Sequence, residues 1–251
     1  MNKNLDIKTL SASKEDLLRI IEASKEDLRN NKILPERVDA VKRVQIVKYT
    51  NLFNILYATK SDNSFLKEKL EELILKLPEY WVQDKVKVFH GRKRIELHQY
   101  SLDAYHQMLM IMSLAVIFDV SKDKFATIVQ LIDRDNVKDF LYEHFIRYYF
   151  PDREKITEES YIKFFAIPKM NKRIVDILEN DDKTTLSKNL KQYLDKYWYK
   201  THKDFSWYDS HKKYPNAFYG YWAFEVAALV KMKDLDDSLF RDNEFYPDRL
   251  I

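Results

Sequence analysis

Cysteine is absent from this chain of 251 residues, and glycine occurs only at positions 91 and 220. Without cysteine there can be no disulfide, no thiolate metal ligand and no cysteine nucleophile. Folds rich in hairpins and phosphate-binding loops use glycine where the backbone turns sharply or approaches a ligand closely. The shortage of glycine therefore favours helices joined by short polar turns, and the lack of cysteine suits a reducing cytoplasm.

Long hydrophobic runs are also missing. The longest, from Met108 to Phe118, holds about eleven residues, whereas a transmembrane helix needs roughly twenty. We interpret this run as a buried core helix. The first six residues, Met1 to Asp6, lack the apolar stretch of a signal peptide. From these patterns we expect a cytoplasmic protein without a membrane contact.

Neither charge sign dominates, because 43 basic and 40 acidic residues give a net charge of +3. A nucleic-acid-binding protein usually shows a larger basic excess or a basic stripe, and a protein that mimics DNA usually shows an acidic excess. Neither description fits the whole chain. Recognition by charge would therefore use local patches.

Apolar residues recur at helical spacing along most of the chain. A capped start at Ser13 opens the first predicted helix, which ends near Asn30, and Pro35 opens the second at its first turn. Further helices are predicted over about 65–77, 97–118, 122–132, 135–149, 157–165, 169–179, 184–199 and 216–232. We predict an all-α protein, a multi-helix bundle of two packed helical halves, with an N-terminal domain over 10–130 and a C-terminal domain over 135–251.

One segment is ambiguous in its secondary structure. Residues 86–97 alternate in polarity around His90-Gly91, which is compatible with a short β-hairpin. The same residues are compatible with a basic loop between two helices, because Arg92, Lys93 and Arg94 are adjacent. Both interpretations stay open at this point.

No constellation for metal binding or nucleophilic catalysis is evident. The chain has six histidines, and His98 and His106 on one helix would lie roughly 12 Å apart along its axis, too far to share a zinc ion. Nothing requires His202 and His211 to converge. A Gly-x-Ser-x-Gly motif and a glycine-rich phosphate loop are both absent. We expect no metal and no cofactor.

A nuclease-like pattern occurs but lies in the wrong context. Restriction-type nucleases place a Pro-Asp pair and a later acidic-x-Lys on adjacent strands, where the carboxylates hold Mg²⁺. Pro151-Asp152 and Asp181-Asp182-Lys183 fit this pattern formally. The first follows a predicted helix and is typical of a helix stop, and the second is typical of a turn and helix cap. We therefore expect no enzyme.

Aromatic and acidic residues gather in the last quarter of the chain. Trp222 heads an apolar helix and is predicted to be core, whereas aromatic residues in the polar stretch 204–214 are typical of interface anchors. Six acidic and three basic side chains between Met232 and Ile251 give a local charge of −3, which could meet a basic cleft or could serve helix capping and solubility. The candidate partner-binding residues are Trp207, Tyr208, Asp209, Tyr214, Asp234, Asp236, Asp237, Asp242 and Glu244.

Three stretches of the C-terminal part carry a family resemblance. They are Tyr219-Gly220-Tyr221-Trp222-Ala223-Phe224-Glu225, Phe240-Arg241-Asp242-Asn243 and Tyr246-Pro247-Asp248. With them, residues of about 140–251 resemble the C-terminal domain of PoNi-type immunity proteins. The first half, about 10–130, is similar to the companion domain of that family, mainly through Ser101 to Val120.

The resemblance implies an all-helical protein made beside a PoNe-type DNase toxin. Such a protein would bind the toxin and protect the producing cell and its kin, often in type VI or other polymorphic toxin systems. It implies neither catalysis nor a cofactor, and the partner would be the toxin rather than nucleic acid. The oligomeric state, including a homodimer, stays open. The alternative function is a helical nucleic-acid-binding or regulatory module that uses the aromatic clusters and the Arg92–Arg94 patch.

Overall fold

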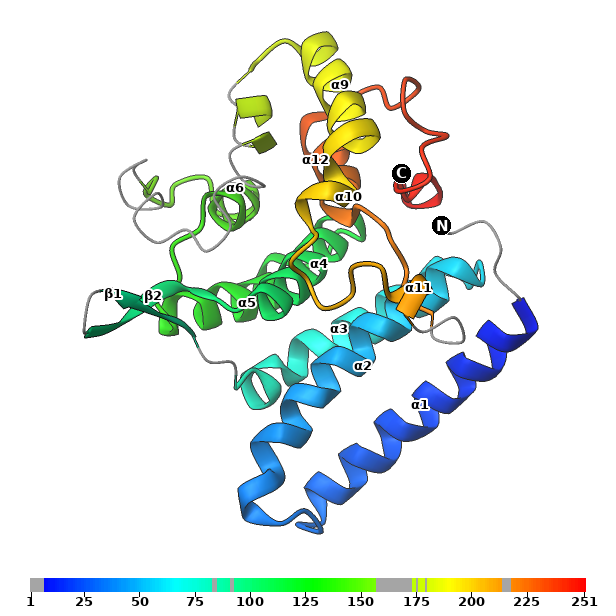
Figure 1. Ribbon diagram of the computed structural model, residues 1–251, viewed down its shortest axis with the longest axis vertical. Coiled ribbons are helices and arrows are strands. Elements are labelled where there is room, and N and C mark those ends of the chain that lie inside the picture. The colour runs from blue at the N-terminus through cyan, green and yellow to red at the C-terminus, as the bar shows by residue number, and fades with distance from the viewer. Residues whose placement is uncertain are drawn as a thin grey trace.

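The computed structural model describes residues 7–82, 85–90, 93–156, 173–174, 176–178, 180–213 and 218–251, with the backbone alone for the strands over 85–98. Helices make up most of this part of the chain, and two strands form a hairpin at one edge (Figure 1). The prediction of an all-α multi-helix fold is confirmed.

The first half begins with three long helices, α1 (Ile7–Arg29), α2 (Val38–Ala58) and α3 (Asn63–Tyr80), in which α1 packs on α2 and α2 on α3. Pro35 opens a 3-10 turn, η1 (Pro35–Arg37), directly before α2, where its missing N–H is harmless. Asp62 caps α3 by accepting a hydrogen bond of 2.7 Å from the Ser64 N–H. The helix continues through Pro78 to Tyr80.

The ambiguous segment forms the hairpin. Strands β1 (Lys85–His90) and β2 (Lys93–Tyr100) pair antiparallel, with Val88 opposite Ile95 and His90 opposite Lys93. Because β2 extends to Tyr100, the helix predicted from Leu97 begins later, at Leu102. The Tyr100 ring is fully buried, and its hydroxyl donates to Asp135 at 2.6 Å. This distant contact explains why the local pattern placed the boundary incorrectly.

Two apolar helices meet at the centre of the molecule. Helix α4 (Leu102–Ile117) belongs to the first half, and α12 (Phe224–Lys233) to the second, and they pack directly on each other (Figure 1). Helices α5 (Lys122–Arg134) and α6 (Phe140–Tyr149) pack on the same α4. Asp139 caps α6 by accepting from the Tyr142 N–H at 3.0 Å. The predicted start of α6 near residue 135 was therefore several residues too early.

The second half is built around a helix of changing pitch. Helix α9 (Lys183–Gln192) passes into a π-helix, η2 (Tyr193–Tyr197), and then into α10 (Trp198–Thr201). Two short elements follow, α11 (Ser210–Lys213) and the C-terminal 3-10 turn η3 (Asp248–Leu250). The predicted helix over 157–165 and part of that over 169–179 lie outside the described residues.

The apolar helix predicted from residue 216 begins only at Phe224. Residues 218–223 are not helical, and the Ala223 N–H donates to the Phe245 carbonyl at 2.8 Å. Trp222 lies in this non-helical stretch and is 6% exposed. Its predicted place in the core is therefore correct, although the helix starts after it.

Candidate partner-binding surface

The acidic C-terminal segment, residues 234–245, runs beside the helix formed by α9, η2 and α10 (Figure 1). Four contacts hold it there: Lys183 with Asp234, Ser187 with the Asp236 carbonyl, Asp195 with Asn243 and Tyr199 with Phe245. These contacts follow the order of both segments. The helix from residue 183 to residue 199 would span roughly 24 Å, so the acidic segment forms an extended surface rather than one pocket.

Three of the predicted carboxylates lie on the exterior of this segment. Asp234, Asp236 and Asp242 are exposed, and the Asp234 side chain is 98% accessible despite its ion pair with Lys183 at 2.8 Å. The hydrogen bond and charge of Lys183 lower the pKa of Asp234, and hydrogen bonds from Ser238 lower that of Asp236. Glu244 is partly exposed. Asp234 and Asp236 are therefore ionised and accessible at neutral pH.

Asp237 differs from its neighbours, and its prediction as an accessible contact is wrong. Its side chain is 5% exposed. It accepts hydrogen bonds from Arg241 Nε at 3.0 Å, Arg241 Nη2 at 2.7 Å and the Tyr246 hydroxyl at 3.0 Å. Three donors compensate the burial of this charge. Asp237 therefore fixes the turn internally and cannot face a partner.

Trp207 was predicted as a surface anchor and is instead a core residue. It is 4% exposed, and its ring stacks on Tyr219 with a centroid distance of 5.4 Å and an interplanar angle of 6°. The rings of His106 and His202 each lie 5.3 Å away. The polar neighbours of Trp207 in the sequence suggested exposure, whereas the rings of Tyr219, His202 and the distant His106 bury it.

Tyr208 and Asp209 stay partly accessible. Tyr208 stacks on Tyr199 at 4.5 Å. Asp209 has a positive φ of 58° and accepts hydrogen bonds from the Tyr199 hydroxyl at 2.7 Å and from Lys212 at 3.0 Å. These donors lower the pKa of Asp209. The residue therefore shapes the turn before α11 while keeping its negative charge; Tyr214 lies outside the described residues.

Tyr199 brings the two predicted segments together. Its ring contacts Tyr208 at 4.5 Å and Phe245 at 5.6 Å, so Tyr208 and Phe245 both pack against the same residue of α10. We use the name acidic strip for Tyr208, Asp209, Asp234, Asp236, Asp242 and Glu244. The strip consists of the predicted residues that the structure leaves accessible.

The nuclease-like pattern falls at helix ends, as interpreted from the sequence. Asp152 is exposed in the turn after α6, and Asp182 caps α9 by accepting from the Thr185 N–H at 2.8 Å. Neither residue lies on a strand. Over the described ranges, no group of three or more His, Asp or Glu side chains is arranged to hold a metal ion.

A helix that spans a bilayer needs roughly twenty predominantly apolar residues. None of the described helices combines enough residues with enough apolar character to do so.

Sequence reasoning did not identify a pocket between α6 and α12, where His144, Arg147, Lys155 and Lys233 gather. These residues come from segments about 80 positions apart in the chain. The basic residues Arg147 in the last turn of α6 and Lys233 at the end of α12 are features of the sequence that could have indicated a cationic site. Only the fold, however, shows that the two helix ends face the same space.

The fold and this surface define an all-helical protein whose predicted site residues are surface carboxylates and stacked rings. The family model described as PoNe immunity proteins (PoNi), C-terminal, matches residues 137–250. Residues 137–250, a little under half of the chain, are therefore similar to the C-terminal domain of PoNi immunity proteins. Neither a curated protein nor a solved structure matches the chain. The similarity of residues 10–130 to the companion domain stays a prediction.

Proposed function

We propose that this chain binds a cognate DNase toxin of the PoNe class, neutralises it and thereby protects the producing cell. The observation that carries the proposal is the family match over residues 137–250. The chain would act in the cytoplasm, where such a toxin would reach DNA, as part of a type VI or other polymorphic toxin system. The protein partner is the toxin, and direct contact with nucleic acid is not required.

The acidic strip supports this proposal. A DNase needs a basic surface to hold the phosphate backbone of its substrate. Exposed carboxylates such as Asp234, Asp236 and Asp242 are complementary to such a surface. Complementary charge speeds association and discriminates among partners. We infer that the strip faces the DNA-binding side of the toxin.

The first test is co-expression with a PoNe-class toxin encoded beside the chain, followed by co-purification and a plasmid-cleavage assay. We expect a stoichiometric complex and loss of cleavage when the chain is added in equimolar amount. Cleavage that continues undiminished in the presence of the folded chain would contradict the proposal.

The strip itself can be tested by charge removal. In the variant Asp234→Asn/Asp236→Asn/Asp242→Asn we expect association with the toxin to slow by about tenfold at low salt, with a smaller difference at high salt, because salt screens exposed charges. Asp237 is kept, since it is buried. The matched control removes three exposed carboxylates elsewhere, at Asp39, Glu68 and Asp123. Equal association rates for the two triple variants, measured by stopped-flow fluorescence, would exclude the strip as the docking surface.

A further inference from the structure

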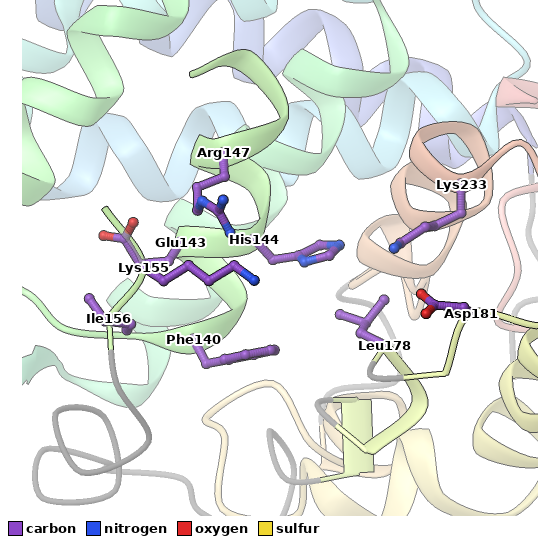
Figure 2. Close-up of a pocket in the computed structure, with 9 residues that line it drawn as sticks. All are labelled: Phe140, Glu143, His144, Arg147, Lys155, Ile156, Leu178, Asp181 and Lys233. Carbon is purple, nitrogen blue, oxygen red and sulfur yellow. The ribbon is translucent and has the colours of Figure 1, made fainter. Parts of the chain in front are cut away.

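A pocket of about 450 Å³ lies between α6, the segment that follows it, and the end of α12 (Figure 2). This volume is within the range of ligand-binding pockets. All of its lining residues fall within residues 137–250. It is separate from the acidic strip, although Lys233 in the pocket directly precedes Asp234 in the strip.

Three cationic side chains converge on this pocket. Arg147 comes from the last turn of α6, Lys155 from the segment after it, and Lys233 from the end of α12. In Figure 2 the amines of Lys155 and Lys233 point toward the His144 imidazole from opposite sides. Arg147 is oriented by donating to the carbonyls of Arg153 at 3.1 Å and Pro151 at 3.4 Å, which are neutral acceptors. Within the described ranges, no carboxylate forms an ion pair with any of these three cations.

His144 adds a polar atom without a partner. Its Nε2 is buried and has no hydrogen-bond partner among the described residues. Burial, followed by the charges of Lys233 and Arg147, lowers the pKa of His144 to about 4, so the ring is neutral at physiological pH. Leaving a buried polar atom without a partner costs free energy. A ligand that hydrogen-bonds to this nitrogen would remove that cost.

The pocket also contains two acidic residues, Glu143 and Asp181. Glu143 accepts two hydrogen bonds from Arg153, at 2.8 and 2.9 Å. Arg153 also pairs with Asp133, so its single positive charge is shared between two carboxylates. Asp181, the uncompensated carboxylate, lines the side near Lys233 (Figure 2). Three cations therefore face two lining carboxylates, and the excess positive charge lies toward Arg147 and Lys155.

We propose that this pocket binds an anionic group, a carboxylate or a phosphate, between Arg147, Lys155 and Lys233. Charge-assisted hydrogen bonds from these side chains supply the attraction. The Phe140 ring, which lies nearly parallel to His144 at 6.4 Å, provides an apolar wall for the group that carries the anion. The anion has two sources, a free small molecule or an acidic side chain of a protein partner.

The binding chemistry is tested on the full chain alone, with inorganic phosphate and acetate as probes at constant ionic strength. The readout is the NMR signal of the His144 ring, assigned by its loss in His144→Gln. We expect phosphate to shift this signal saturably. In Lys155→Gln/Lys233→Gln we expect affinity to fall by about tenfold, whereas the exposed control pair Lys200→Gln/Lys203→Gln keeps the wild-type affinity.

A gain of affinity provides the complementary test. Asp181→Asn removes the uncompensated carboxylate and is expected to tighten phosphate binding severalfold, an effect that misfolding could not produce. Absence of saturable shifts with both anions, or equal affinities in wild type and Lys155→Gln/Lys233→Gln, would overturn the proposal.

The source of the anion is resolved by measuring toxin affinity with the same two lysine variants. A loss of about tenfold confined to Lys155→Gln/Lys233→Gln would assign the pocket to an acidic side chain of the toxin. An unchanged affinity would assign it to a free anion. This second measurement rests on the proposed function, whereas the phosphate titration does not, so a failure of either proposal is recognised separately.

Discussion

Glu225 places a carboxyl group inside the core of the C-terminal half. It is 4% exposed, and its Oε1 accepts a hydrogen bond of 2.6 Å from Trp198 Nε1. Burial raises its pKa from 4.5 to about 7, although hydrogen bonds from the backbone and from Trp198 oppose the shift. Between about pH 4.5 and 7 the Glu225 carboxyl group is therefore protonated in the folded state and ionised in the unfolded state. In this window the contribution of Glu225 to stability falls as pH rises.

The variant Glu225→Gln isolates this contribution, because its amide oxygen can still accept from Trp198. We expect the stability of wild type relative to Glu225→Gln to fall by about 2 to 3 kcal/mol between pH 5 and pH 8. Urea unfolding at several pH values measures the difference. Parallel stability curves for the two proteins would show that the carboxyl group does not titrate in this range.

Two buried histidines have the opposite pH dependence. His106 and His202 lie edge to face at 6.0 Å within the aromatic cluster around Trp207. Burial lowers the pKa of His106 to about 3, with a further contribution from His202, and lowers that of His202 to about 4. As pH falls below 6.5 the unfolded state binds protons first, so stability is lost toward pH 4.

Replacing one histidine should reduce this acid sensitivity. His106→Phe keeps an aromatic ring in the cluster and removes one titrating group. We expect its unfolding free energy to fall less steeply than that of wild type between pH 6 and pH 4.5, by about 1.4 kcal/mol per pH unit. Urea titrations over this range give both slopes, and identical slopes would contradict the buried, neutral state of His106.

At the scale of elements, the stretch before α12 depends on a glycine. A Cβ at Gly220 would overlap the Trp222 ring and lie 2.8 Å from Asn54 Oδ1. Trp222 in turn packs edge to face on Tyr57 of α2, with a centroid distance of 4.8 Å. Gly220 therefore allows the non-helical chain to approach the first half of the molecule closely.

Gly220→Ala should accordingly destabilise the protein by overpacking. We expect a loss of about 1 to 3 kcal/mol in unfolding free energy, measured by urea denaturation with tryptophan fluorescence. The Trp222 ring would have to move away from Tyr57, so a changed emission spectrum of the folded state is also expected. Wild-type stability in Gly220→Ala would show that the ring relocates without cost.

Elements with regular apolar spacing were predictable from the sequence. Helices α3 and α5 were recognised because their buried faces repeat every three or four residues. The start of α12 was not, because residues 218–223 are apolar enough to extend the helical pattern, yet the Ala223 N–H bonds to the Phe245 carbonyl. The candidate site shows the same limit. Asp234 and Asp236 were recognised as surface charges, but the burial of Trp207 depends in part on His106, about 100 residues earlier in the chain.

At the scale of the whole molecule, the two helical halves share one hydrophobic core. Every residue of α4 from Met108 to Ile117 is buried, and so is every residue of α12 from Phe224 to Val230. The end of the chain adds a second connection, because the Tyr57 hydroxyl donates to Asp248 at 2.9 Å and Arg249 donates to the Tyr57 carbonyl. Separation of the halves would expose apolar surface on both helices to water, which is unfavourable.

Because neither half can bury its central helix alone, we expect the whole chain to unfold in one cooperative transition. Trp81 lies in the first half, and the other three tryptophans lie in the second. In Trp81→Phe, fluorescence therefore reports only the second half, whereas far-UV circular dichroism is weighted toward the long helices α1, α2 and α3. Coincident urea midpoints for the two signals are the expected result. Separate midpoints would show that the regions 10–130 and 135–251 unfold as independent domains, and contact between α4 and α12 would then be too weak to couple them.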